Sequence, residues 1–127
     1  MKKLHTKFQK ELTKSLEAEG RLTLNVHGSA WQASGWPDFQ CYWKGRSTHV
    51  EVKIDNDPVS DTQWKVIREL RKRGIAAVVV RLWSKTSAVT FDGVEGASWT
   101  RKECAQRFGP ILDAVVAGCN TRNEASK

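Results

Sequence analysis

Three residues in the middle of the chain have the types and spacing that divalent-metal chemistry requires. Asp38 follows Pro37, and Glu51 and Lys53 stand two residues apart in the run Glu51-Val52-Lys53. Alternate residues of a β-strand project from the same face, so Glu51 and Lys53 would lie together while Val52 points to the opposite face. The sequence therefore predicts a carboxylate and an amine side by side on one strand.

A predicted β-hairpin brings a second carboxylate to the same place. Residues 38–43 and 48–53 have the composition of strands and flank a turn around Lys44-Gly45. Folding back at this turn places Asp38 opposite Glu51, where the Cβ atoms of paired residues are about 4.5–5.5 Å apart. Two carboxylates this close repel each other unless a cation joins them. The pair therefore predicts a Mg²⁺ site, in which Mn²⁺ would substitute.

A metal ion held here would supply the chemistry of phosphodiester hydrolysis. Mg²⁺ prefers oxygen ligands and keeps several waters, so Asp38, Glu51 and the backbone carbonyl of Val52 would suffice beside a substrate phosphate. Such an ion polarises the phosphate and acidifies the attacking water. Lys53 would orient that water or stabilise charge in the transition state. An ordinary half-exposed strand with a cross-strand ion pair shows the same alternation, so the prediction depends on Asp38.

The elements that must position these side chains follow from hydrophobic periodicity and from capping signals. Ser60-x-x-Gln63 has the spacing of a capping box. The β-branched run over 75–83 lacks alternation, which indicates a central strand buried on both faces. The predicted elements are a helix from Leu4 to Gly20, half-buried strands over 21–26, 38–43 and 48–53, a helix over 60–73, a strand over 75–83, a weaker strand over 88–91, and a helix from a second capping box at Thr100 to Gly118.

This order predicts an α/β fold with a mixed central sheet flanked by helices. A crossover helix between the hairpin and the strand over 75–83 would make the strands on either side of it parallel. With 127 residues the chain has room for one ordinary domain. We expect that domain to occupy residues 1–119 and residues 120–127 to form a frayed tail.

Composition narrows the function classes. The formal net charge of +7 comes from 21 Lys and Arg against 14 Asp and Glu, and it favours a polyanionic partner such as nucleic acid. No apolar run approaches the roughly 20 residues of a membrane span, and the basic N-terminus lacks the apolar stretch of a secretion signal. Three cysteines without a CxxC pair argue against a zinc site or a disulfide framework. We therefore expect a cytoplasmic protein without a membrane partner.

Basic and small polar residues suggest where DNA would bind. Two predicted helices are crowded with lysine and arginine, which would contact phosphates with salt-dependent affinity. The alternative is a pair of solvated helix faces. Small residues in the loop before Pro37 would let DNA approach the carboxylates. The candidate DNA-binding residues are Lys7, Lys10, Lys14, Arg68, Arg71, Lys72, Ser29 and Ser34.

Together these motifs resemble a known nuclease superfamily. Gly35-Trp36-Pro37-Asp38, twelve further residues, Glu51-Val52-Lys53 and then Ser60-x-x-Gln63 are similar to the PD-(D/E)XK pattern. Within it, the chain most resembles the VRR-NUC branch and the related archaeal-type Holliday junction resolvases. The resemblance spans about residues 5–83. It implies a restriction-endonuclease-like core of order αβββαβ, which matches the predicted elements.

The resemblance also implies roles for individual residues. Asp38 and Glu51 would be metal ligands and Lys53 the catalytic lysine. Gln63 would lie near the active site, a role compatible with helix capping. These families place a glutamate in the first helix, which this chain lacks at the matching position. The residues available to complete the metal site are His5, Gln9 and Glu11.

By resemblance, the function would be that of a Mg²⁺-dependent, structure-selective endonuclease. It would act on branched DNA of the Holliday junction or flap type, in recombination or repair, as a homodimer that sets two active sites on two strands. A restriction-like or nicking nuclease of the same fold is one alternative. A catalytically silent DNA-binding module is a second, favoured by the missing glutamate. A basic scaffold with an incidental motif is a third.

Overall fold

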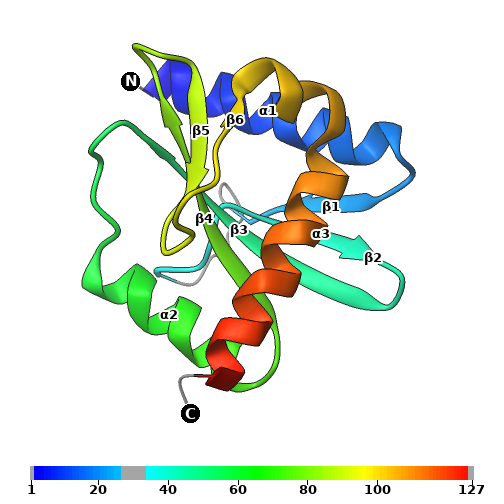
Figure 1. Cartoon of the computed structure of the whole chain (residues 1–127), viewed down its shortest axis with the longest axis vertical. Helices are drawn as coiled ribbons and strands as arrows, with labels where there is room; N and C mark the ends of the chain where they lie inside the picture. Colours follow the sequence, from blue (N-terminus) through cyan, green and yellow to red (C-terminus); the bar gives the residue numbers. More distant parts are fainter. Residues whose placement is uncertain (1, 27–33, 126–127) are drawn as a thin grey trace.

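A computed structural model describes the backbone of residues 2–26 and 34–125, and the surroundings of side chains over 3–26 and 34–118. Within these residues the chain forms helices and strands in the predicted order, with one added short strand (Figure 1). The elements are α1 (Lys2–Ala18), β1 (Leu22–Asn25), β2 (Phe39–Trp43), β3 (Arg46–Ile54), α2 (Asp61–Lys72), β4 (Ala76–Trp83), β5 (Ala88–Phe91), β6 (Trp99–Thr100) and α3 (Arg101–Ala125).

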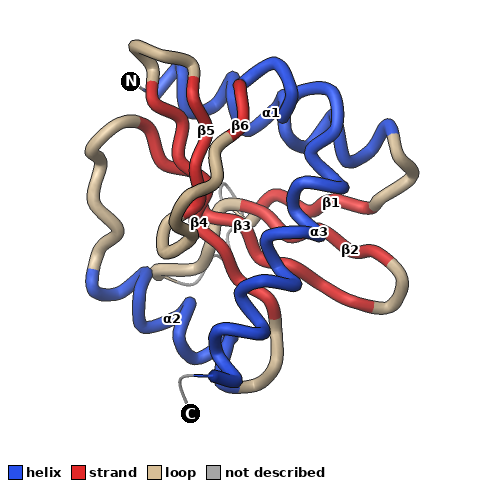
Figure 2. Tube along the Cα trace, viewed as in Figure 1, coloured by secondary structure: helices blue, strands red, loops and turns tan. Residues whose placement is uncertain are grey.

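The strands form one mixed sheet in the order β1-β2-β3-β4-β5-β6 (Figure 2). Helix α2 connects β3 to β4, which pair in parallel, while the other neighbours are antiparallel. A crossover helix between neighbouring strands produces this parallel pair. The predicted α/β class with a mixed sheet flanked by helices is confirmed, and β3 and β4 lie at its centre.

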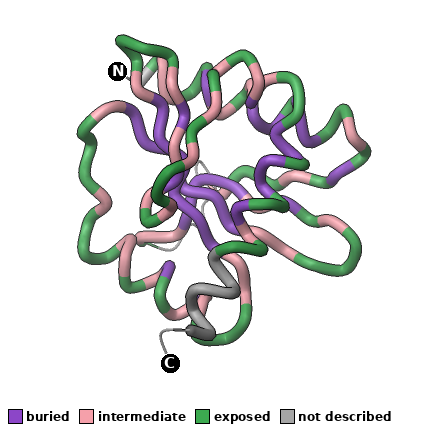
Figure 3. Tube along the Cα trace, in the orientation of Figure 1, coloured by how far each residue is buried: buried purple, intermediate pink, exposed green. Residues whose placement is uncertain are grey.

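Two helix layers cover the two faces of the sheet unequally. Phe8 and Leu12 of α1 and Phe108 of α3 pack against Val50 and Val52 of β3 in the larger hydrophobic cluster. Helix α2 packs a smaller cluster against the opposite face of β4. Figure 3 shows the central strands as the most continuously buried part of the chain. Because Glu51 and Lys53 alternate with these valines, they lie on the α2 side of the sheet.

The hairpin that carries the predicted site has the expected register. Lys44 and Gly45 form its two-residue turn with φ values of 52° and 75°, both in the left-handed region that such tight hairpin turns require. Phe39 pairs with Val50 in the antiparallel ladder. Asp38 directly precedes this first pair, so β2 begins one residue later than predicted and Asp38 lies at the end of the ladder.

The prediction of a half-buried β1 with its leucines inward is wrong. Leu22 and Leu24 are 66% and 53% exposed, whereas Arg21 is buried. The reason is the position of β1 at the edge of the sheet. Its leucines lie on the face that α2 covers, but α2 packs against β4 and does not extend as far as β1. Arg21 enters the other face, makes a two-point hydrogen bond with Asp113 of α3 and stacks over Trp43.

Helix α3 differs from the prediction at its end. It continues through Gly118 to Ala125 instead of ending at Gly118. A glycine inside a helix costs only about 1 kcal/mol, which the rest of the helix can outweigh. The predicted capping box at its start is confirmed by reciprocal bonds between Thr100 and Glu103. Across the described residues, no helix combines the length and the apolarity that crossing a membrane would need.

Candidate active site

Asp38 stands directly before β2 and turns its carboxylate toward β3. Its Oδ2 accepts a hydrogen bond of 2.7 Å from the backbone N–H of Val52, and the side chain is buried. The hairpin register makes this contact possible, since it brings the start of β2 beside the middle of β3. The carboxylate is therefore held at the point where the predicted ligands meet.

Glu51, Lys53 and Gln63 form a second group on the α2 side. Lys53 Nζ lies 3.4 Å from Glu51 Oε2, and Gln63 Nε2 donates to the same oxygen at 3.0 Å. Gln63 also completes the predicted capping box, because its Oε1 accepts from Ser60 N–H while Ser60 Oγ accepts from Gln63 N–H. The Gln63 side chain thus caps the start of α2 and also orients the Glu51 carboxylate. Its capping role and its position beside the candidate active site are therefore compatible.

The electrostatics of Glu51 favour a cation. The residue is only 3% exposed, and its Oε1 is a buried oxygen without a hydrogen-bond partner among the described residues. Burial, followed by the negative charge of Asp38, raises the pKa of Glu51 to about 7, although Lys53 opposes the rise. A buried carboxylate with an unsatisfied oxygen binds a cation readily, because the cation removes the penalty of desolvation.

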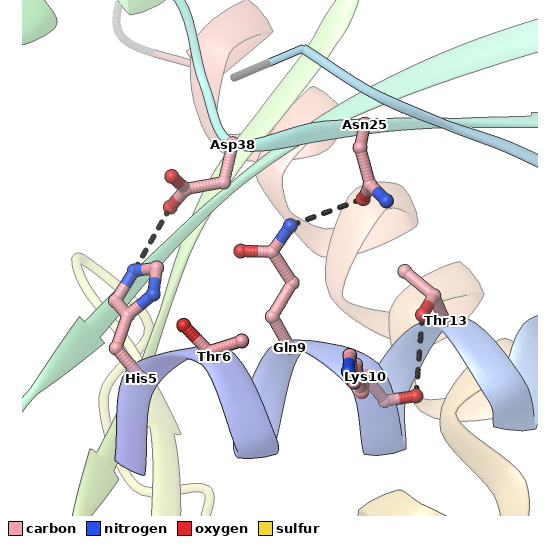
Figure 4. A pocket seen from close by; sticks show the side chains of 7 residues that line it. All are labelled: His5, Thr6, Gln9, Lys10, Thr13, Asn25 and Asp38. Atoms are coloured by element: carbon pink, nitrogen blue, oxygen red, sulfur yellow. Dashed lines mark hydrogen bonds and ion pairs between the residues drawn. The ribbon is translucent and has the colours of Figure 1, made fainter. Parts of the chain in front are cut away.

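His5 is the residue of α1 that reaches these groups. Its Nε2 lies 3.3 Å from Asp38 Oδ2 (Figure 4). The same nitrogen lies 2.9 Å from the carbonyl oxygen of Val52. The hydrogen bond to Asp38 raises the pKa of His5, against the lowering effect of burial. One helical turn later, Gln9 donates to Asn25 Oδ1 at 3.1 Å. His5, Gln9, Asn25 and Asp38 line one side of a cavity of about 350 Å³.

Glu11 does not belong to this group. Its two carboxylate oxygens pair with the Arg101 guanidinium of α3 at 2.9 and 2.8 Å. This pair ties α1 to α3, so the structure does not bring Glu11, one of the residues suggested to complete the metal site, together with Asp38 and Glu51. The helical spacing allowed Glu11 to edge inward, but the inward neighbour is α3 and not β2.

The donor set fits a divalent metal ion in its chemistry. In the described part of the chain, no three His, Cys, Asp or Glu side chains already lie in a metal-holding arrangement. The oxygens of Asp38, Glu51 and the Val52 carbonyl are nevertheless the hard donors that Mg²⁺ prefers. The buried Oε1 of Glu51, which has no hydrogen-bond partner among the residues described, is the observation that supports the fit.

The candidate DNA-binding residues are distributed unequally. Lys7, Lys10 and Lys14 are exposed on α1, and Lys10 lines the cavity beside Asp38. On α2, Arg68 is exposed, Lys72 pairs with Glu69 at 3.5 Å, and Arg71 donates to the Ala77 carbonyl. Arg71 is thus tied to the fold. Ser34 is exposed, and Ser29 lies outside the described residues.

Two residues next to the site, Asp57 and His49, were not predicted from the sequence. Asp57 Oδ2 lies 3.7 Å from Lys53 Nζ, in the turn after β3. His49 precedes Glu51 on the same face of β3 and is buried against Trp36, and its Nδ1 has no hydrogen-bond partner within the part of the chain that the structure describes. Burial lowers the pKa of His49. The spacing of Asp57 from Lys53 was visible in the sequence, but a turn, unlike a strand, has no periodicity that tells where a side chain points.

Comparison with known proteins bears on the same region. The VRR-NUC domain model matches residues 6–82, which contain most of α1, the hairpin, α2 and nearly all of β4. No curated protein matches the chain significantly. Among solved structures, Hjc, a Holliday junction resolvase from the archaeal hyperthermophile Archaeoglobus fulgidus, matches with a TM-score of 0.50 and 20% identity, over 67% of this chain and 72% of the resolvase chain. The chain therefore belongs to the VRR-NUC family of the PD-(D/E)XK nucleases.

Proposed function

We propose that this nuclease is a Mg²⁺-dependent, structure-selective endonuclease that hydrolyses phosphodiester bonds in branched DNA, of the Holliday junction or flap type. The observation that carries the proposal is the buried group of Asp38, Glu51 and Lys53, in which Glu51 Oε1 lacks a partner among the described residues. The fold shared with a protein named as a Holliday junction resolvase supports branched DNA as the substrate.

Each residue would have a distinct task. Asp38, Glu51 and the Val52 carbonyl would hold the ion, which supplies a polarised phosphate and an acidified water. Lys53 would orient that water or stabilise the charge that develops on the phosphate. Gln63 orients the Glu51 carboxylate through its 3.0 Å hydrogen bond. Groups that orient a ligand in this way commonly change metal affinity when removed.

His5 is our candidate for the residue that completes the site from α1. It already touches Asp38 and the Val52 carbonyl, two of the three proposed ligands. An imidazole nitrogen is a softer ligand than the oxygens around it and suits Mn²⁺ at least as well as Mg²⁺. Mn²⁺ would therefore substitute for Mg²⁺ in cleavage.

DNA would approach along the basic face of α1. Lys7, Lys10 and Lys14 are exposed there, and Lys10 lies at the cavity that Asp38 lines. We propose that these lysines contact the phosphate backbone of the DNA, and that Arg68 and Lys72 form a second contact on α2. We further propose a homodimer, because two equivalent sites suit the two strands that a four-way junction requires to be cut.

A panel of substrates tests the proposal. A four-way junction, a flap, a single strand and a linear duplex would each be incubated with Mg²⁺ and with Mn²⁺. We expect metal-dependent cleavage of the branched substrates, abolished in Asp38→Asn and Lys53→Ala while DNA binding is largely retained. Glu95→Gln, which removes an exposed acid from the β5–β6 loop, serves as the control. Metal-independent cleavage, or robust cleavage by Glu51→Gln, contradicts the mechanism.

A catalytically silent DNA-binding module is the second candidate. It is favoured by the absence of an acid from the part of α1 that reaches the carboxylates, where His5 and Gln9 stand. It predicts salt-sensitive DNA affinity and no cleavage in either metal. A restriction-like or nicking nuclease predicts instead that the linear duplex is cleaved as well as the junction.

A further inference from the structure

The turn after β3 places one more carboxylate beside the lysine of the active site. Asp57 lies three residues beyond the end of β3, with Oδ2 at 3.7 Å from Lys53 Nζ. Glu51 Oε2 lies 3.4 Å from the same nitrogen. Lys53 is buried, whereas the Asp57 side chain is 55% exposed. The ammonium group is therefore shared between a buried carboxylate and an exposed one.

Arg81 fixes this turn from the neighbouring strand. It is buried on β4, beside Lys53 in the parallel register. Its Nη1 donates to the carbonyl oxygens of Asp55 and Asp57, at 2.7 and 2.6 Å. Its Nε and Nη2 donate to the two oxygens of Asp92, at 3.0 and 2.8 Å. Because the planar guanidinium is held on both edges, it cannot rotate without losing several bonds at once.

The first residue of the turn is tied down as well. Asp55 has a φ of 51°, and its carboxylate accepts from the N–H and the hydroxyl of Ser84, at 2.8 and 2.7 Å. Its own N–H donates to the Leu82 carbonyl at 2.8 Å. The turn is thus attached to the end of β4 at both Asp55 and Asp57. The backbone that carries the Asp57 carboxylate is therefore held in place by hydrogen bonds to β4 and to Ser84.

We propose that Asp57 is a positioning residue for Lys53, and that Arg81 fixes the turn that presents it. The inference rests on the proposed function, since it needs Lys53 to act at the scissile phosphate. With a metal ion bound, Glu51 would be one of its ligands and would also accept from Gln63, so less of its negative charge would act on the ammonium group of Lys53. Asp57 is neither a proposed metal ligand nor a partner of Gln63, so it can hold the Lys53 ammonium group in position. A displacement of about 1 Å at a reacting group can lower a rate by about 10²-fold.

Single-turnover cleavage of the best branched substrate tests the rate. We expect Asp57→Asn to lower the rate constant for cleavage roughly tenfold. This loss is larger than the removal of a weak, exposed ion pair would cause and smaller than the loss from a misplaced catalytic group. DNA affinity should stay the same or rise slightly, because an acid that repels phosphate is removed. Asp57→Glu, which keeps the charge, should recover much of the rate. Glu95→Gln controls for the loss of one negative charge.

The Lys53 ammonium itself provides a readout that does not depend on cleavage. Its ¹⁵N–¹H signal, assigned by its absence from Lys53→Ala, reports how firmly the group is held. Asp57→Asn should broaden this signal through faster proton exchange, while Glu95→Gln leaves it sharp. Arg81→Lys, if it folds, should reproduce both effects and add little when combined with Asp57→Asn, because both changes remove the same contact.

The outcomes separate this inference from the proposed function. An unchanged ammonium signal in Asp57→Asn overturns the inference, and so does an unchanged rate constant in an active enzyme. If the wild-type protein cleaves no DNA, the proposed function has failed, and the ammonium signal alone still decides whether Asp57 holds Lys53. Tighter DNA binding with undiminished cleavage would make Asp57 an ordinary solvated acid.

Discussion

Replacing Glu51 with glutamine should stabilise the metal-free protein at neutral and alkaline pH. The ordinary pKa of this glutamate is 4.5, and burial raises it to about 7 in the folded chain. The folded state therefore favours the protonated form. Above pH 7 the folded protein must hold a buried negative charge, whose oxygen Oε1 has no partner among the described residues. The glutamine side chain would present a neutral group of similar size.

The magnitude follows from that difference in pKa. A change from 4.5 to about 7 corresponds to about 3 kcal/mol of folding free energy. The attraction between Lys53 and the Glu51 carboxylate is already contained in this figure, because it lowers the pKa of Glu51 in the folded chain. At about 3 °C per kcal/mol for a domain of this size, Glu51→Gln should raise Tm by up to about 9 °C.

The sign depends on pH, and that dependence is the test. A carboxyl group whose folded pKa is raised contributes stability below its unfolded pKa and loses it as pH rises toward the folded value. The Tm difference between Glu51→Gln and wild type should therefore be near zero below pH 4.5 and grow to its full value at pH 7 to 8. Differential scanning calorimetry with EDTA measures it, and Glu95→Gln provides the reference. A pH-independent difference refutes the reasoning. Added Mg²⁺ should shrink it, because only the wild-type carboxylate gains a cation.

Three further predictions concern residues around the site. Gly35→Ala should destabilise the chain by about 3 kcal/mol in urea unfolding, because φ is +83° and the new Cβ would also clash with a backbone oxygen of α2 at 2.8 Å. Gly45→Ala, with positive φ but open space, should cost about 1 kcal/mol, and equal losses would contradict the packing argument. Ser60→Ala and Gln63→Ala should each lower the free energy of unfolding by about 1 kcal/mol, because each removes part of the helix cap. Titration calorimetry should find the affinity for Mg²⁺ lowered about tenfold only in Gln63→Ala. Lys10→Ala should reduce the slope of log affinity for DNA against log salt by about 0.9, and an unchanged slope removes it from the DNA contact.

Strand and helix periodicity predicted the elements, and local signals predicted the ends of several. The valine-rich run, the two capping boxes and the Lys44-Gly45 turn depend only on neighbours in the chain, so sequence reasoning placed them well. The leucines of β1 show where such reasoning stops. Their alternation indicated an inward face, but whether a face is covered depends on how far α2 extends across the sheet. That extent is a property of the packed fold.

The site divides in the same way. The sequence by itself determined that Glu51 and Lys53 share one face of a strand, because side chains alternate with a period of two. The register that brings the start of β2 beside them depends on the two-residue length of the turn, which the structure shows. Only the tertiary structure shows which neighbours His5 and Glu11 meet, since both lie on α1: His5 contacts the Val52 carbonyl, and Glu11 pairs with Arg101 of α3. It also decided the place of Asp57, because a turn is positioned by its bonds to Arg81 on another strand and not by any repeat in its own residues.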